Sequence, residues 1–122
     1  MKNQASAKSF HQKAVIVDDE IDICLLLSMT LHKLGVSSVR AHTLSDGLEK
    51  AASEQPMIIF LDNNLTDGKG IDQIAEFRQK SPLSKLIMIT AMSGLREQAL
   101  AAGADGFVEK PLDLPKILSV LS

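Results

Sequence analysis

Polar residues follow directly on short apolar runs at several separate places in this sequence. In chain order they are Asp18, Asp19 and Glu20 after residues 14–17, Asp62 after 57–61, Thr90 after 86–89, and Lys110 shortly after 106–108. Carboxylates that are brought together repel one another, and a divalent cation is the usual compensation. A site built from oxygen ligands, without His or Cys, suits Mg²⁺ better than zinc.

A lysine and a hydroxyl beside such carboxylates would suit phosphoryl chemistry. Lys110 and Thr90 offer an ammonium group and a hydroxyl that can hold the oxygens of a phosphoryl group. One carboxylate could then act as the nucleophile and form an acyl phosphate. This chemistry requires all these positions to meet, so the elements that carry them must bring their ends together.

Apolar runs and helical segments alternate along the chain from Ala14 onward. The sequence predicts strands at 14–17, 36–41, 57–61, 86–89 and 106–108, and helices at 20–34, from Thr43 or Ser45 to Gln55, and at 71–79, 94–102 and 114–121. This alternation calls for right-handed βαβ units and an α/β fold, a doubly wound parallel sheet with helices on both faces. Five strands suit the flavodoxin-like order 2-1-3-4-5, in which sites form at the carboxyl ends of the strands.

Composition limits the remaining function classes. The chain has 122 residues, a mass of 13.2 kDa and a net charge of −2, which fits one domain without a basic surface for nucleic acid. Aromatic residues make up only 3%, which argues against a base-stacking platform, and Cys24 as the one cysteine excludes a disulfide framework. Residues 1–13 are polar and predict a flexible leader before a folded domain at 14–122. No run is long enough to span a membrane, so we expect a cytoplasmic protein.

Five short motifs, in order at the five strand ends, make the chain resemble the receiver domains of bacterial response regulators, the CheY-like phosphoaccepting modules of two-component signalling. The motifs are Asp18-Asp19, the lone Asp62 after Ile-Ile-Phe-Leu, Thr90-Ala91, Gly103-Ala104-Asp105-Gly106-Phe107, and Lys110-Pro111. Each motif alone is weak, but the ordered set is highly specific. The resemblance covers residues 14–122, which leaves no folded length for an output domain in this chain.

The resemblance implies a role for each matched residue. Asp62 would be the phosphoacceptor, and Asp19 and Asp62 would bind Mg²⁺ together with the backbone carbonyl of Asn64, with Asp18 supporting the ion through water. Lys110 would pair with the phosphoryl group, and Thr90 would turn its hydroxyl toward that group after phosphorylation. Phe107 would be the aromatic residue that moves inward with Thr90. The Lys110-Pro111 peptide bond is expected to be cis, an isomer that is otherwise a minority state.

The sequence departs from the family pattern at two places that bear on the site. Leu65-Thr66 stand where family members usually carry Met-Pro, so the loop that carries Asn64 lacks a stiffening proline. Phe107 lacks the hydroxyl of the commoner Tyr, so only packing can drive its movement. The nearby run Asp67-Gly68-Lys69-Gly70 lacks the spacing of a phosphate-binding loop and predicts a turn.

The leading hypothesis is a phosphorylation-driven switch rather than a metabolic enzyme. A histidine kinase or phosphotransfer protein would donate the phosphoryl group, and the face of the fourth and fifth strands would bind a downstream effector or a second copy of the chain. One alternative is a haloacid-dehalogenase-like phosphatase, but Asn64 replaces the second acid of its Asp-x-Asp-x-Thr motif. The other is a receiver-like interaction module that is never phosphorylated.

Overall fold

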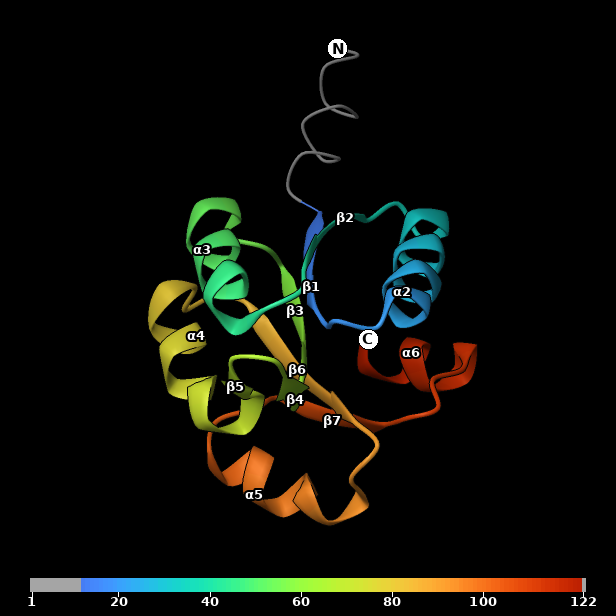
Figure 1. The fold of residues 1–122 in the computed structure, drawn as a ribbon. Coiled ribbons are helices and arrows are strands. Elements are labelled where there is room, and N and C mark those ends of the chain that lie inside the picture. The colour runs from blue at the N-terminus through green and yellow to red at the C-terminus, as the bar shows by residue number, and fades with distance from the viewer. Residues whose placement is uncertain (1–11, 122) are drawn as a thin grey trace.

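The computed structural model describes residues 12–121, so residues 1–11 of the expected leader lie outside the described part of the chain. A five-stranded sheet lies at the centre of the molecule (Figure 1). Its strands are β1 (Lys13–Val17), β2 (Ser37–Ala41), β3 (Ile58–Asp62), β6 (Lys85–Thr90) and β7 (Gly106–Glu109). Their spatial order is β2-β1-β3-β6-β7 and every neighbouring pair is parallel, which confirms the predicted 2-1-3-4-5 topology.

Helices cover both faces of the sheet. They are α2 (Ile21–Lys33), α3 (Leu44–Glu54), α4 (Ile74–Lys80), α5 (Arg96–Ala101) and α6 (Leu114–Leu121). Helices α2 and α6 pack on one face, and α3, α4 and α5 pack on the other (Figure 1). Thr43 begins α3 as its N-cap, because its Oγ1 accepts a hydrogen bond from Asp46 N at 3.1 Å.

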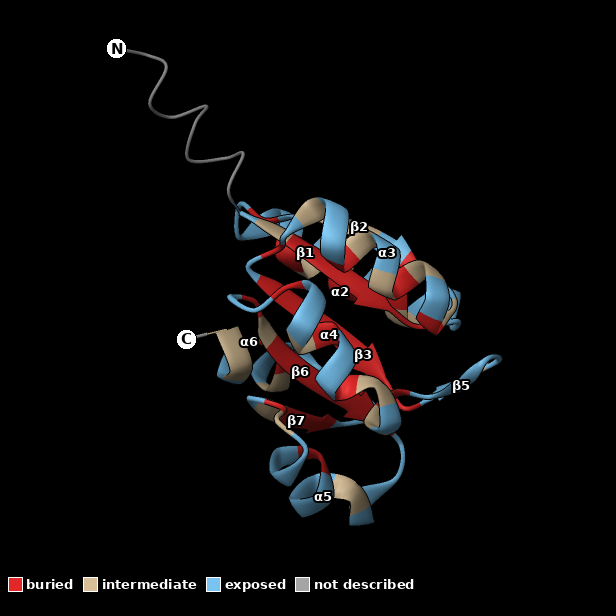
Figure 2. Ribbon diagram, turned by 90° about the vertical axis from the view of Figure 1, so that its left-hand side faces the viewer, coloured by how far each residue is buried: buried red, intermediate tan, exposed pale blue. Residues whose placement is uncertain are grey.

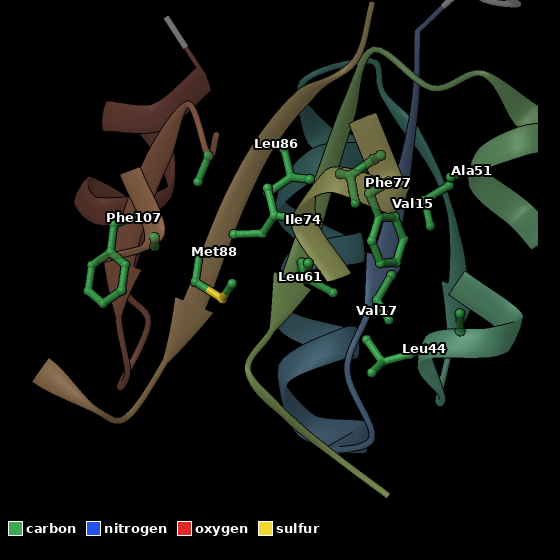
Figure 3. Close-up of a cluster of buried hydrophobic side chains, with 14 residues drawn as sticks. Val15, Val17, Leu44, Ala51, Leu61, Ile74, Phe77, Leu86, Met88 and Phe107 are labelled. Carbon is green, nitrogen blue, oxygen red and sulfur yellow. The ribbon is translucent and has the colours of Figure 1, made fainter. Parts of the chain in front are cut away.

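Alternating side chains of the central strands fill two separate cores. Val15 and Val17 of β1 join the cluster beneath α3 and α4, whereas Ala14 and Ile16 join the cluster beneath α2 and α6. Figure 3 shows the first cluster, in which Phe77 lies beside Val15. All five residues of β3 are buried, as is usual for a parallel strand that is covered on both faces (Figure 2).

The segment after β3 differs from the expected plain turn. It forms a two-stranded antiparallel hairpin, β4 (Asn64–Leu65) and β5 (Gly68–Lys69), which leads into the 3₁₀ helix η1 (Gly70–Gln73) before α4 begins. The expected helix at 71–79 is therefore part 3₁₀ and part α. The expected helix at 94–102 likewise begins with the 3₁₀ helix η2 (Ser93–Leu95).

Gly70 allows the start of η1 to pass close to the backbone at the end of β3. A Cβ atom at this position would lie 2.3 Å from the Asp62 carbonyl oxygen, so only glycine allows the two backbone segments to come this close. The Gly70 N–H also donates a hydrogen bond to the Asn63 carbonyl at 2.8 Å. None of the helices in the described part of the chain has the length and apolar character needed to cross a membrane.

Candidate functional site

The carboxyl ends of β1, β3, β6 and β7 place the predicted polar residues on one edge of the sheet. Asp62 is the last residue of β3 and Thr90 the last of β6, while Asp18 and Lys110 closely follow β1 and β7. Backbone hydrogen bonds hold these ends in register. Asp18 N donates to Ala41 O at 3.0 Å, and Lys110 N donates to Thr90 O at 2.8 Å.

Three carboxylates meet at this edge. Asp18, Glu20 and Asp62 each have an oxygen within 4.8 Å of the other two. Asp18 and Asp62 are buried, whereas Glu20 is exposed. Asp19 is also exposed and is not a member of this close group, so its assignment as a metal ligand stays a prediction.

The Lys110 ammonium group lies among these carboxylates. Its Nζ is 3.0 Å from Asp18 Oδ2 and 3.4 Å from Asp62 Oδ1, and it also forms an ion pair with Glu20. The lysine side chain is itself only 11% exposed, so solvent screens these charges weakly. One partly buried cation is thus shared among three anions, which leaves the cluster with an excess of negative charge.

Burial and the neighbouring charges shift the pKa values in this cluster. Burial, reinforced by the charge of Asp18, raises the pKa of Asp62 to about 6, against the opposing effect of Lys110. Burial likewise raises the pKa of Asp18, although the hydrogen bond from Glu20 N and the Lys110 ammonium oppose it. Burial alone would lower the pKa of Lys110, but its bonds to Glu20 and Asp18 raise it, so the lysine stays charged.

A divalent cation fits this donor set. Asp18 Oδ1 accepts a hydrogen bond from Glu20 N at 2.8 Å, but the buried Asp18 Oδ2 accepts no hydrogen bond of good geometry, although Lys110 Nζ is near. A buried carboxylate oxygen without such a partner is costly and indicates that a further positive group belongs beside it. The residues that meet here offer oxygen atoms, which favours a hard cation such as Mg²⁺ or Ca²⁺.

Thr90 and Phe107 occupy the neighbouring part of the sheet. Thr90 is fully buried, and its Oγ1 accepts a hydrogen bond from Met92 N at 3.1 Å. Phe107 is only 8% exposed and joins the core cluster that contains Met88 (Figure 3). The Arg96 guanidinium lies 5.8 Å from the centre of its ring. The aromatic ring is therefore buried in this structure, and its predicted coupling to Thr90 stays a prediction.

Two further predictions concern Asn64, two residues after Asp62, and the peptide bond that follows Lys110. Asn64 is exposed, lies in β4 and pairs with Lys69 of β5, so its backbone is part of the hairpin beside the acidic cluster. The Lys110-Pro111 peptide bond is cis, the isomer that the family resemblance implies.

The sequence already places Glu20 beside Asp18 and Asp19 at this edge, but it does not indicate the ion pair between Glu20 and Lys110. It also does not indicate the contacts of Asp67 in the neighbouring hairpin. Asp67 fits the pattern of a turn residue, yet its carboxylate accepts hydrogen bonds from Leu44 N and Ser45 N, 23 and 22 residues away. No local pattern in the sequence carries a signal for either long-range contact.

Comparison with known families agrees with the geometry of this edge. The family model for the response regulator receiver domain matches residues 14–122. The response regulator protein PilR of Pseudomonas aeruginosa is 37% identical over 113 residues, which are 91% of this chain and 25% of PilR. The chain therefore spans about a quarter of the length of that relative.

Solved structures share the fold over nearly the whole chain. A response regulator from Burkholderia pseudomallei, crystallised with a phosphorylated aspartic acid, a calcium ion and citrate, is 25% identical and superposes with a TM-score of 0.83, covering 91% of this chain and 66% of that one. A CheY-like receiver domain protein from Methanospirillum hungatei is 28% identical, with a TM-score of 0.82 and 90% of both chains covered.

Proposed function

Because the chain belongs to the response regulator receiver domain family, a family of signalling modules, we propose that Asp62 is its phosphoacceptor. The observation that carries this proposal is the contact of Asp62 with Lys110 at 3.4 Å, inside a group of three carboxylates at the sheet edge. Asp62 is the carboxylate that ends a fully buried strand, so its position is fixed by the core beneath it. A carboxylate held in place beside a partly buried ammonium group is suited to nucleophilic attack on phosphorus.

Mg²⁺ is the cation that we propose for the acidic cluster. Asp19, Asp62 and the backbone carbonyl of Asn64 would hold the ion, with Asp18 supporting it through water, as the family resemblance implies. The ion would supply positive charge that offsets both the carboxylates and the incoming phosphoryl oxygens. The excess negative charge around Lys110 supports this assignment, as does the buried Asp18 Oδ2, which accepts no hydrogen bond of good geometry although Lys110 Nζ lies 3.0 Å away.

Phosphorylation would then be a direct displacement. An Asp62 oxygen forms a bond to phosphorus while the bond from phosphorus to the donor histidine nitrogen breaks, and the imidazole leaves with that electron pair and takes up a proton from water. The Lys110 ammonium neutralises charge on the transferring oxygens from its place 3.4 Å from Asp62. Hydrolysis of the resulting acyl phosphate by water would reset the switch.

The signal would leave the site through Thr90. Its hydroxyl oxygen now accepts a hydrogen bond from Met92 N, and its proton would be donated to a phosphoryl oxygen on Asp62 when the side chain rotates toward that group. The rotation would release Met92 N and the loop after β6 and repack Phe107, which is buried on the adjacent strand β7. The face of β6 and β7 with its flanking helices would thereby change its affinity for a downstream effector or a second copy.

The partners follow from this chemistry. The donor would be a sensor histidine kinase or a histidine phosphotransfer protein, and the output would pass to an effector protein or domain. We propose no direct contact of this module with nucleic acid, in keeping with its net charge of −2.

Acetyl phosphate with Mg²⁺ gives a direct test by intact-protein mass spectrometry. The wild-type protein should gain the mass of one phosphoryl group, and Asp62→Asn should gain none. Asp72→Asn, which neutralises an exposed acid on η1, is the matched control and should label like the wild type. Labelling that persists in Asp62→Asn would overturn the assignment, and many turnovers of a generic phosphate ester would favour a phosphatase instead.

A further inference from the structure

The turn of the β4–β5 hairpin is bonded to the start of a distant helix. Asp67 Oδ1 accepts a hydrogen bond from Leu44 N at 2.8 Å, and Asp67 Oδ2 accepts one from Ser45 N at 3.0 Å. These N–H groups belong to the first turn of α3, where the helix itself provides no acceptor. The two bonds lower the pKa of Asp67, so the carboxylate stays ionised at neutral pH.

Helix α3 already has a local cap, so capping alone does not account for Asp67. Thr43 Oγ1 accepts the hydrogen bond of Asp46 N, as an ordinary N-cap residue does. The hairpin also rests on the same helix through Gly68, where an added Cβ would lie 3.1 Å from Leu44 Cδ1. Both contacts attach the exposed hairpin to a helix that is packed on the central sheet.

The same hairpin carries the backbone of Asn64. Asn64 pairs with Lys69, and Leu65 pairs with Gly68, so the turn at Thr66 and Asp67 closes a ladder that begins two residues after Asp62. A proline would stiffen such a turn, but Thr66 stands where the family usually has one. The carboxylate bonds of Asp67 supply an alternative restraint on the same turn.

We propose that Asp67 is a positioning residue, which fixes the Asn64 backbone for Mg²⁺ by clamping the β4–β5 turn to the first turn of α3. The inference rests on the proposed function, because it takes the Asn64 carbonyl as a ligand of the ion. Asp67 itself does not belong to the acidic cluster of Asp18, Glu20 and Asp62. Its effect would pass through the backbone of the hairpin.

Magnesium titration of Asp67→Ala tests this proposal. The chain has no Trp or Tyr, so calorimetry and amide NMR shifts are the suitable readouts. We expect the dissociation constant for Mg²⁺ to rise roughly tenfold, at the low end of the losses seen when groups that orient metal ligands are removed. Hydrogen exchange of the hairpin amides, measured without metal, should be faster in the variant. Asp67→Asn keeps one acceptor oxygen and should give smaller changes of both kinds.

Two further variants separate positioning from general stability. Thr43→Ala removes the local cap of α3, so it should lower stability without weakening Mg²⁺ binding. Thr66→Pro, added to Asp67→Ala, should recover Mg²⁺ affinity by stiffening the turn in another way. Among the described residues Gln55 is the only non-glycine with a positive φ, so Thr66 does not have the left-handed conformation that would exclude proline.

Several results would overturn the inference while leaving the proposed function intact. One is an unchanged Mg²⁺ affinity in Asp67→Ala, provided that the wild type binds the ion. Another is an equal loss of affinity in Thr43→Ala, which would assign the effect to helix stability. A third is a failure of Thr66→Pro to restore any affinity. A wild type that binds no Mg²⁺ would instead overturn the proposed function, and this inference with it.

Discussion

Lys110 is the residue on which the charge balance of the site depends. Its ammonium group lies near Asp18, Glu20 and Asp62, and two of these three carboxylates are buried. An ammonium group can offset one negative charge fully but not three, so the ionised cluster is strained by repulsion in the metal-free protein. Burial is the main cause of the raised pKa of Asp62, about 6, and the neighbouring charge of Asp18 adds to it.

The pKa of Asp62 leads to a prediction about Asp62→Asn and pH. A carboxyl group whose pKa is raised by folding holds its proton more tightly in the folded state, so its contribution to stability falls as pH rises from about 4 to about 6. At pH 7.5 without metal, removing this charge should therefore stabilise the protein, by about 1–3 kcal/mol for a shift of roughly two units. Urea unfolding of both proteins at pH 7.5 and pH 4.5 measures the effect.

The gain should shrink markedly at pH 4.5, where the folded wild type keeps Asp62 protonated. Asp72→Asn, at an exposed position, serves as the control and should change stability little at either pH. An Asp62→Asn gain that is the same size at both pH values would show that charge is not its cause.

At the scale of elements, side-chain hydrogen bonds and a close backbone approach constrain the short segment between β3 and α4. It contains the β4–β5 hairpin and η1, and Figure 2 shows the hairpin extending from the end of the sheet as an exposed element. Asn63 connects the start of this segment to η1, because its buried side chain accepts a hydrogen bond from Ile71 N at 3.0 Å. The loop is thus held at its start by Asn63 and at its turn by Asp67.

Gly70→Ala should disrupt this connection. The added methyl group would lie 2.3 Å from the Asp62 carbonyl oxygen, a backbone atom that cannot move without shifting the end of β3. We expect a loss of about 2 kcal/mol or more in the free energy of unfolding, together with weaker Mg²⁺ binding. Gly94→Ala is the matched control, since no atom lies within 4 Å of the added group, and it should be neutral or slightly stabilising. Equal stability of the two variants would contradict the steric argument.

The sequence predicts the five main strands and their order because four of them are distinct apolar runs, while β2, with the sequence Ser-Ser-Val-Arg-Ala, is indicated more weakly and follows from the alternation with helices. The β4–β5 hairpin cannot be predicted in this way. Strands of two residues show no hydrophobic periodicity, and Asn64 and Lys69 are both exposed, so no apolar run marks them. Residues at strand ends, such as Asp62 and Thr90, can be assigned to one edge from topology alone. Contacts such as Glu20 with Lys110 depend on side-chain geometry that topology does not determine.

At the scale of the whole molecule, the two cores hold a rigid sheet beneath a charged edge. The buried strands leave little freedom for the site to relax. A cation bound at the edge should therefore raise the free energy of unfolding of the whole domain. The local negative charge is much denser than the overall net charge of −2 indicates. Binding energy at the edge therefore adds to the free energy of global unfolding.

Mg²⁺ should accordingly raise the resistance of the wild-type protein to urea. At a free concentration about 100 times the dissociation constant, the expected gain is about 2.7 kcal/mol. A sodium salt at the same ionic strength is the control, because screening alone would relieve part of the repulsion. Equal midpoints in the two salts would exclude a specific cation site.

The ion pair between Glu20 and Lys110 also has a consequence for the timing of folding, since the two residues are separated by 90 positions along the chain. Contacts of such high contact order close a large loop and require β1, β3, β6 and β7 to be in place first. A nascent chain that ends before β7 would already contain Asp62 but would have no ammonium group beside it. The site therefore acquires its complete charge pattern only when the last strand joins the sheet.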